Sequence, residues 1–191
     1  NQKTFADATW SSGPGGFGFG ITVPGITIRQ VSKNGSIGGL DDALALLALP
    51  EGNSGILLSA TAVSDTVNLL GDGSDGHFAF NAVPPGGGGD QYAVAATGFV
   101  TIPAAGTYTF GLNSDDGGRI LIDGVEIMRD DSWHGAQDSF GTVTLAAGQH
   151  SFEAVMFEGG GDDSLEFFAA SGSWSSFDSS AFHLVGDVAS G

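Results

Sequence analysis

An adjacent pair of aspartates could hold a divalent cation. Asp115 and Asp116 follow a predicted strand, 107–113, and precede two glycines. Consecutive side chains of an extended trans chain point in opposite directions, so a trans pair does not readily offer both carboxylates to one ion. A cis peptide shortens the distance between the two Cα atoms from about 3.8 to about 2.9 Å and brings both carboxylates to one side. The pair therefore predicts a cis peptide bond with both carboxylates on one Ca²⁺.

A second acidic loop follows another predicted strand, 151–158. It reads Glu-Gly-Gly-Gly-Asp-Asp over residues 158–163. The three glycines allow the backbone to turn its carbonyl groups toward a common centre. Ca²⁺ takes about six to eight oxygen ligands from carboxylates, carbonyls and water, which is more than one Asp pair supplies. Each loop could supply ligands to a calcium ion, and an ordinary solvated turn is the alternative for each of them.

These loops must be positioned by strands, because the second half of the chain is a regular series of short apolar segments. Alternation of apolar and polar residues, interrupted by glycine, is typical of strands. Strands are expected at 97–102, 107–113, 119–122, 125–128, 140–145, 151–158 and 165–170. The Asp123-Gly124 pair between two of them is a strong hairpin signal. Strands at this spacing predict an all-β fold, an antiparallel β-sandwich or barrel.

The first half of the chain is less regular. Strands are expected at 5–10, 21–31 and 56–70, with breaks at Pro24 and near Ser64, and a glycine-rich loop at 13–20. Asp41–Leu49 is the one predicted helix, because two aspartates in its first turn favour the helix dipole and Pro50 ends it. The length of 191 residues suits one domain, residues 1–191.

Charge and composition exclude several kinds of partner. Five Lys and Arg residues stand against 22 Asp and Glu, which gives a net charge of −17 at pH 7. A phosphate backbone or an anionic membrane surface would be repelled, so we expect neither nucleic-acid binding nor direct membrane insertion. The longest apolar run, Ala43–Leu49, is also far shorter than the ~20 residues of a membrane helix. The chain has no cysteine, which excludes disulfides and thiolate metal sites.

Four short motifs occur in order in the second half of the chain. They are Gly-Thr-Tyr-x-Phe at 106–110, Ser-Asp-Asp-Gly at 114–117, Ile-Asp-Gly at 122–124 and Leu-x-x-Gly-x-His at 145–150. In this combination the sequence resembles the protective-antigen domain family, most clearly over 96–170, with 1–95 as a variable part of the same domain. The resemblance implies an antiparallel β-sandwich or barrel. Members of the family include lectins, domains that accompany glycosidases and a structural toxin domain, so the role must be argued from the site.

The resemblance also implies a set of ligands. Lectins of the family carry a cis Asp-Asp pair at the positions of Asp115 and Asp116, and the second loop completes the shell. That pattern assigns the metal ligands to Asp115, Asp116, Glu158, Gly160 and Asp162, the last two through their carbonyl oxygens. Two neighbouring hydroxyls of a sugar would fill the remaining positions. The expected sugar-binding residues are Asp115, Asp116, Glu158, Gly159, Gly160, Asp162, Asp163 and Trp133.

Two of these residues, and one further loop, leave alternatives open. Glu158 stands where yeast members have an amide, so that three acids would meet one Ca²⁺, which should tighten ion binding. Trp133 could stack on a sugar face or be a buried aromatic. The loop that contains Asp72 and Asp75 resembles a fragment of a calcium loop but lacks its final Glu, and a further ion there is left open.

We therefore expect a calcium-dependent lectin module of a large bacterial surface adhesin, serving cell adhesion and biofilm formation. It would be an extracellular, monomeric module in a longer chain that binds cell-surface glycans or free sugars of a glucose-like or fucose-like type. We do not expect an enzyme, because a glycosidase needs two carboxylates about 5–9 Å apart in distinct environments, whereas these acids are adjacent at loop tips. An accessory carbohydrate-binding domain of a glycosidase and a structural spacer are the alternatives.

Overall fold

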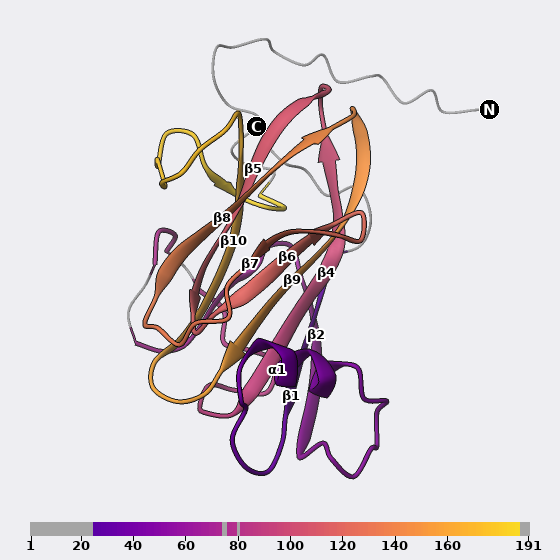
Figure 1. Ribbon diagram of the computed structural model, residues 1–191, viewed down its shortest axis with the longest axis vertical. Helices are drawn as coiled ribbons and strands as arrows, with labels where there is room; N and C mark the ends of the chain where they lie inside the picture. The colour runs from indigo at the N-terminus through magenta and orange to yellow at the C-terminus, as the bar shows by residue number, and fades with distance from the viewer. Residues whose placement is uncertain (1–24, 74–75, 80, 188–191) are drawn as a thin grey trace, which may run out of the picture.

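The chain forms two antiparallel β-sheets and one short helix in the residues that the computed structural model describes, 25–73, 76–79 and 81–187 (Figure 1). The strands are β1 Ile26–Ser32, β2 Leu58–Ser64, β3 Asn68–Asp72, β4 Tyr92–Ile102, β5 Gly106–Asp115, β6 Gly118–Ile122, β7 Val125–Arg129, β8 Gln137–Leu145, β9 Gly148–Glu158, β10 Asp163–Ser171 and β11 His183–Leu184. The helix is α1, Leu40–Leu47. The predicted all-β fold with one short helix is confirmed.

The two sheets differ in size and in the strands that they collect. The larger sheet has the order β2-β1-β4-β9-β6-β7. The smaller has the order β11-β10-β5-β8, and β3 pairs with β10 beside it. Consecutive strands β5 and β6 lie in different sheets, as do β9 and β10. The segments that join these strands, Asp116–Gly117 and Gly159–Asp162, therefore cross between the sheets at one end of the molecule.

The core lies between the sheets and follows from strand alternation. Tyr108, Phe110 and Leu112 of β5 point inward, as their spacing of two residues predicts, and all three are buried. They pack in one cluster with apolar residues of the opposite sheet, among them Ile120 and Phe152. The cluster joins the two sheets through their inner faces.

Both outer faces are covered in part, which the alternation does not reveal. Helix α1 packs on the larger sheet through Leu40, Ala43 and Leu46. On the smaller sheet, Phe168 of β10 packs under Phe182 from the segment before β11. Eight consecutive residues of β10 are consequently buried, from Asp163 to Ala170, so that polar side chains on its outer face are shielded from solvent as well.

Most predicted elements are found, with shifted ends. The hairpin at Asp123-Gly124 is confirmed, with φ of 49° and 77° at its two central residues, values that the predicted tight turn requires. The predicted strand 56–70 is broken as expected into β2 and β3, which join different sheets. Strand β4 begins earlier than predicted, at Tyr92, and β11 was not predicted. The elements expected at 5–10 and 13–20, and the start of the strand 21–31, lie outside the described residues.

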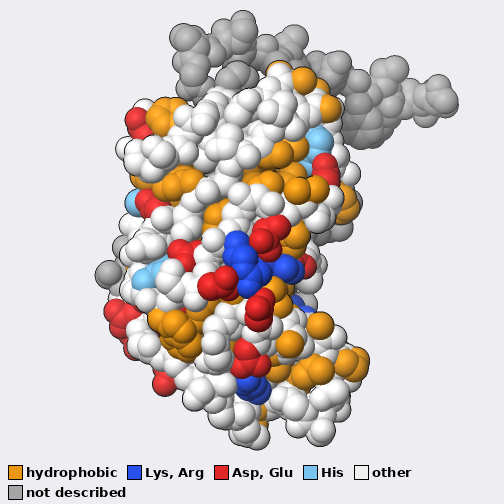
Figure 2. Space-filling view, viewed as in Figure 1, with side chains coloured by type: hydrophobic (Ala, Val, Ile, Leu, Met, Phe, Trp, Pro, Cys, Tyr) orange, Lys and Arg blue, Asp and Glu red, His pale blue; other side chains and the backbone are white. Residues whose placement is uncertain are grey.

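Three basic side chains of the described residues, Lys33, Arg119 and Arg129, form ion pairs with acids. Figure 2 shows basic groups gathered on one face and bordered by acidic ones. Arg129 pairs with Asp41 at 2.6 Å and with Asp131 at 2.8 Å, and Arg119 pairs with Glu153 at 2.5 Å. In the described part of the chain, no helix has the length and apolar character that a membrane span requires.

Candidate metal centre

The two predicted acidic loops meet at the end of the sandwich where β5 and β9 stop. The Asp116 N–H donates to the Phe157 carbonyl at 3.0 Å, and the Phe157 N–H donates to the Gly117 carbonyl at 3.1 Å. Gly117 and Gly118 make this close approach possible, because a Cβ there would lie 2.4 Å from the Asp130 carbonyl oxygen and 2.1 Å from the Val155 carbonyl oxygen. The crossover after β5 is thereby tied by its backbone to the end of β9.

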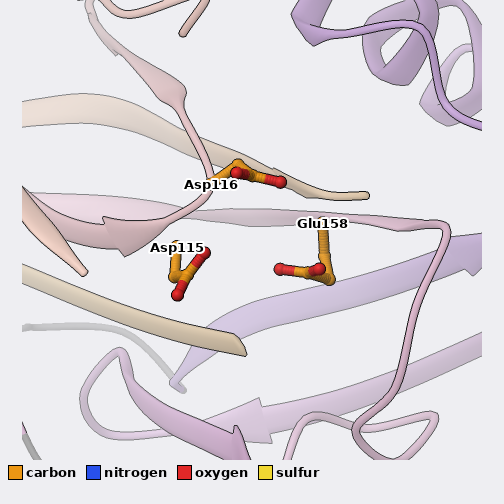
Figure 3. A group of neighbouring side chains, drawn as sticks. All are labelled: Asp115, Asp116 and Glu158. Atoms are coloured by element: carbon orange, nitrogen blue, oxygen red, sulfur yellow. The ribbon is translucent and has the colours of Figure 1, made fainter. Parts of the chain in front are cut away.

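Three carboxylates converge at this point. Oxygens of Asp115, Asp116 and Glu158 all lie within 4.8 Å of one another, and Figure 3 shows the side chains gathered around a common space. The peptide bond between the two aspartates is cis, as predicted. The three residues are almost entirely buried, with 7%, 5% and 0% of their surfaces exposed. Like charges this close and this shielded repel one another unless a cation or protons lie among them.

The hydrogen bonds of the cluster orient its carboxylates but leave at least one of their oxygens without a partner in the part of the chain that the structure describes. Asp116 accepts from the His134 N–H at 2.9 Å and from the Gly159 N–H at 3.1 Å. Glu158 accepts from the Gly160 N–H through Oε1, while its buried Oε2 has no hydrogen-bond partner among the described residues. Ser164, opposite Asp115 in the register of β5 and β10, likewise has a buried Oγ without a partner in this part of the chain. Unfilled oxygens beside three acids fit a hard cation such as Ca²⁺.

Burial and the neighbouring negative charges raise the pKa values of two acids in the cluster. Burial raises the pKa of Glu158 to about 8, and the charges of Asp116 and Asp115 add to the effect. Burial, followed by the charge of Asp116, raises the pKa of Asp115 to about 6. Without a cation the cluster therefore retains a proton at neutral pH. A bound divalent ion would reverse this preference, because it favours the ionised form of each acid.

We expect calcium binding at this cluster to release protons and to strengthen as pH rises. The folded-state pKa values of about 6 and about 8 mean that protons compete with the ion below pH 8. Near pH 7 about one proton should leave per ion bound, mostly from Glu158. Calorimetric titration in two buffers of different ionisation enthalpy measures this number. Equal heats in both buffers, with an affinity unchanged between pH 6 and pH 8, would contradict the assignment.

The second loop is held by residues that the sequence did not single out. The Gln91 side chain donates to the Gly159 carbonyl through Nε2 and accepts from the Ile37 N–H at 2.5 Å through Oε1. Asp90 accepts from the Gly161 N–H at 3.4 Å. The segment before β4 therefore positions the glycine loop. No motif marks these two residues, because they lie about 70 positions from the loop that they hold and reach it only in the folded chain.

The structure corrects one predicted sugar-binding residue. Asp163 is completely buried, and its carboxylate accepts hydrogen bonds from the Tyr92 hydroxyl and from the backbone N–H groups of Asp72 and Gly89. Its hydrogen bonds connect β10 to β3 and to the segment at the start of β4. Because no part of the side chain is exposed, it cannot contact a sugar. Asp162, one residue earlier, is exposed. Asp75, which with Asp72 was left open as a further ion site, lies outside the described residues.

Trp133 lies at the edge of the site and is half exposed. The residue is 53% exposed, and its ring contacts the buried Phe157 edge to face, with centroids 5.3 Å apart. It also covers Gly159 so closely that a Cβ there would lie 1.8 Å from the ring. Of the two alternatives left open from the sequence, the structure places Trp133 on the surface beside the second loop rather than in the core.

Comparison with known proteins agrees with this architecture. The family model described as PA14 domain matches residues 63–183. The crystal structure of the PA14 domain of the MpAFP antifreeze protein aligns with a TM-score of 0.63 at 18% identity, covering 95% of this chain and 93% of that one. A PA14 sugar-binding domain from an RTX adhesin aligns with a TM-score of 0.60 at 22% identity, covering 84% of this chain and 98% of that one.

A longer protein shares the same fold. An anti-sigma factor domain-containing protein aligns with a TM-score of 0.57 at 17% identity over 85% of this chain, which spans about half of that protein, 46%. Among curated proteins no sequence matches this chain significantly. At these identities the structural likeness shows a shared fold, and what the site does must be argued from its own residues.

Proposed function

Because this chain belongs to the PA14 domain family, the protective-antigen family that its motifs resemble, we propose that it is a carbohydrate-binding module that binds a sugar through a bound Ca²⁺. The observation that carries the proposal is the convergence of Asp115, Asp116 and Glu158 within 4.8 Å, buried and with an unfilled oxygen. A solvated turn would leave such acids exposed.

The chain's own residues would share the work of the site. Asp115, Asp116 and Glu158 would hold the ion, and the carbonyl groups of Gly160 and Asp162 are the proposed further ligands. The ion would supply coordination to two neighbouring hydroxyls of the sugar. The backbone N–H groups of His134 and Gly159 hold the Asp116 carboxylate in place, so the ligands are oriented before the sugar arrives, which lowers the entropy cost of binding.

The sugar would meet the site at a surface made by the two loops and Trp133. A single saccharide held by one pair of hydroxyls should bind weakly, near millimolar, or about −4 kcal/mol. Many copies on one surface would raise the effective affinity, which suits an extracellular adhesin module that attaches a bacterial cell to glycans. One of the solved domains with this fold is described as a sugar-binding domain from an RTX adhesin, and this supports the proposal.

The site does not have the form of a glycosidase centre. A cavity of about 340 Å³ lies under α1 and not between the acidic loops. It contains one carboxylate, Glu153, whose charge is paired with Arg119 at 2.5 Å, whereas glycoside hydrolysis uses two carboxylates about 5–9 Å apart. We propose a binding module rather than an enzyme. An accessory domain of a glycosidase would use the same calcium site.

A glycan array probed in calcium and again in chelator tests this function. We expect binding of glycans with accessible vicinal hydroxyls, of glucose-like or fucose-like type, in calcium alone. Deoxy or methyl analogues at one of the two hydroxyls should lose most of the affinity. Changes on the far side of the ring should cost about 1 kcal/mol, the worth of one hydrogen bond. Binding that persists in chelator would count against a role for the ion.

Replacement of Trp133 by alanine should weaken sugar binding without weakening calcium binding. The half-exposed ring lies beside Gly159, and an aromatic contact is worth about 0.5–1.5 kcal/mol beyond its buried area, so a loss of about three- to tenfold in sugar affinity is expected. Retention on a sugar resin and calorimetric titration of calcium measure the two effects separately. Trp174 lies in the segment after β10, where it packs against Phe182, and it offers a Trp174→Ala control with unchanged sugar affinity.

A further inference from the structure

A row of polar side chains crosses the outer face of the smaller sheet. Asn68 of β3 lies opposite Glu166 of β10, Glu166 opposite Asn113 of β5, and Asn113 opposite Asp138 of β8. Residues directly opposite each other in antiparallel strands project to the same face with Cβ atoms about 4.5–5.5 Å apart. Four neighbouring strands therefore place one amide or acid each in a continuous row.

Glu166 is the most deeply buried member of this row, with 1% of its surface exposed. Its two oxygens accept hydrogen bonds from the backbone N–H groups of His77 and Phe78, each at 2.9 Å. The loop passes so close that a Cβ on Gly76 would lie 2.5 Å from Glu166 Oε2. The His77 ring hydrogen-bonds to Asp138 at 2.7 Å. The backbone of residues 76–78 therefore covers the carboxylate of Glu166.

The two amides that flank Glu166 use their N–H donors elsewhere and leave their Oδ1 acceptors beside the carboxylate. Asn113 gives its Nδ2 to Asp138 at 2.8 Å, and Asn68 gives its Nδ2 to the Ala79 carbonyl at 3.0 Å. These acceptors fix the orientation of each amide, so that Oδ1 is the remaining atom. Both Oδ1 atoms are buried and have no hydrogen-bond partner within the described ranges. An unfilled buried acceptor is costly, and here two of them border an acid.

We propose that Glu166, Asn113 and Asn68 bind a second Ca²⁺ beneath the loop at 76–79. Carboxylate and amide oxygens are ligands that this hard cation prefers, and a cation satisfies acceptors that no donor reaches. The ion would hold the loop against the smaller sheet. It would also hold the segment between β10 and β11, because His77 of the loop stacks on Phe177 of that segment with centroids 3.6 Å apart. This second site is structural and does not depend on the proposed sugar binding.

The test begins with a variant that disables only the first cluster. Asp116→Asn is titrated with CaCl₂ by calorimetry in buffered NaCl and melted in chelator and in calcium. We expect this variant to bind one Ca²⁺ per chain and to melt higher in calcium, whereas the unaltered chain binds two. Adding Glu166→Gln should abolish both the remaining binding and the remaining shift. If the Asp116→Asn variant binds no calcium, the proposal is overturned. That result is expected if water or a proton satisfies the oxygens of Glu166, Asn113 and Asn68 instead of an ion.

The single variant Glu166→Gln separates this site from the proposed function. It should lose one of two calcium equivalents and keep calcium-dependent sugar binding. If it does not fold, as judged by circular dichroism, Asn113→Leu replaces it, with the same expected loss. The Asp116→Asn titration decides in either case, because Asp116 lies in a loop outside the row. Two calcium equivalents in a folded Glu166→Gln variant would overturn the assignment.

Discussion

Replacement of Asp116 by asparagine is expected to weaken calcium-dependent sugar binding severely while leaving the fold intact. The change removes one charge from the three buried carboxylates that lie within 4.8 Å of one another and keeps the size of the side chain. Loss of one partner from a buried ionic cluster costs about 3–5 kcal/mol, so the calcium concentration needed for sugar binding should rise on the order of a hundredfold or more. Retention on a sugar resin across a calcium series measures it.

A matched control removes the same charge elsewhere. Asp65 is an exposed aspartate in the turn between β2 and β3, and Asp65→Asn should bind sugar as the unaltered chain does. Circular dichroism should give the same spectrum for both variants. Full sugar retention by Asp116→Asn at low calcium would show that sugar binding does not pass through this cluster.

Replacement of Glu158 by glutamine should change stability and function in opposite directions. The buried carboxylate has its pKa raised to about 8, by burial first, above its value in the unfolded chain. The ion-free folded state therefore binds more protons than the unfolded state, and its stability falls as pH rises through this range. Glutamine removes that dependence. At pH 9 the ion-free variant should be more stable by several kcal/mol, since each pKa unit between the ordinary value of 4.5 and about 8 corresponds to about 1.4 kcal/mol.

The same substitution should weaken calcium binding, because a neutral amide replaces a charged ligand. Melting in chelator at pH 6 and pH 9, and sugar retention across a calcium series, measure the two effects. Glu153→Gln serves as a control, because Glu153 is partly exposed and pairs with Arg119 away from the cluster. A Glu158→Gln variant that is less stable than the unaltered chain in chelator at pH 9, with unchanged calcium dependence, would contradict the account.

The part of the site that is local in sequence could be predicted from it. The aspartates at 115 and 116 follow a strand with clear alternation, and the glycine-rich loop follows another, so both acids and loops are visible as short motifs. The hairpin at Asp123-Gly124 is equally local, since its turn depends on two adjacent residues. The convergence of the two loops followed from the family resemblance and not from spacing, because their meeting depends on which sheets β5 and β9 join.

The part that failed depends on contacts between distant segments. Asp163 was assigned to the sugar with the other residues of the second loop, but its burial is set by Tyr92 and Gly89, more than 70 positions earlier. The row around Glu166 was not predicted for the same reason. Alternation on β10 assigns Glu166 to an outer, polar face, and only the loop at 76–79 and the C-terminal segment turn that face into an interior.

A crystal structure of the chain with calcium and the sugar that binds best on the array tests the central claim most directly. The account predicts an ion with oxygens of Asp115, Asp116 and Glu158 at about 2.3–2.6 Å, and two neighbouring hydroxyls of the sugar on the same ion. Anomalous scattering would identify the ion. A sugar bound without any contact to a metal, for example stacked on Trp133 alone, would contradict it.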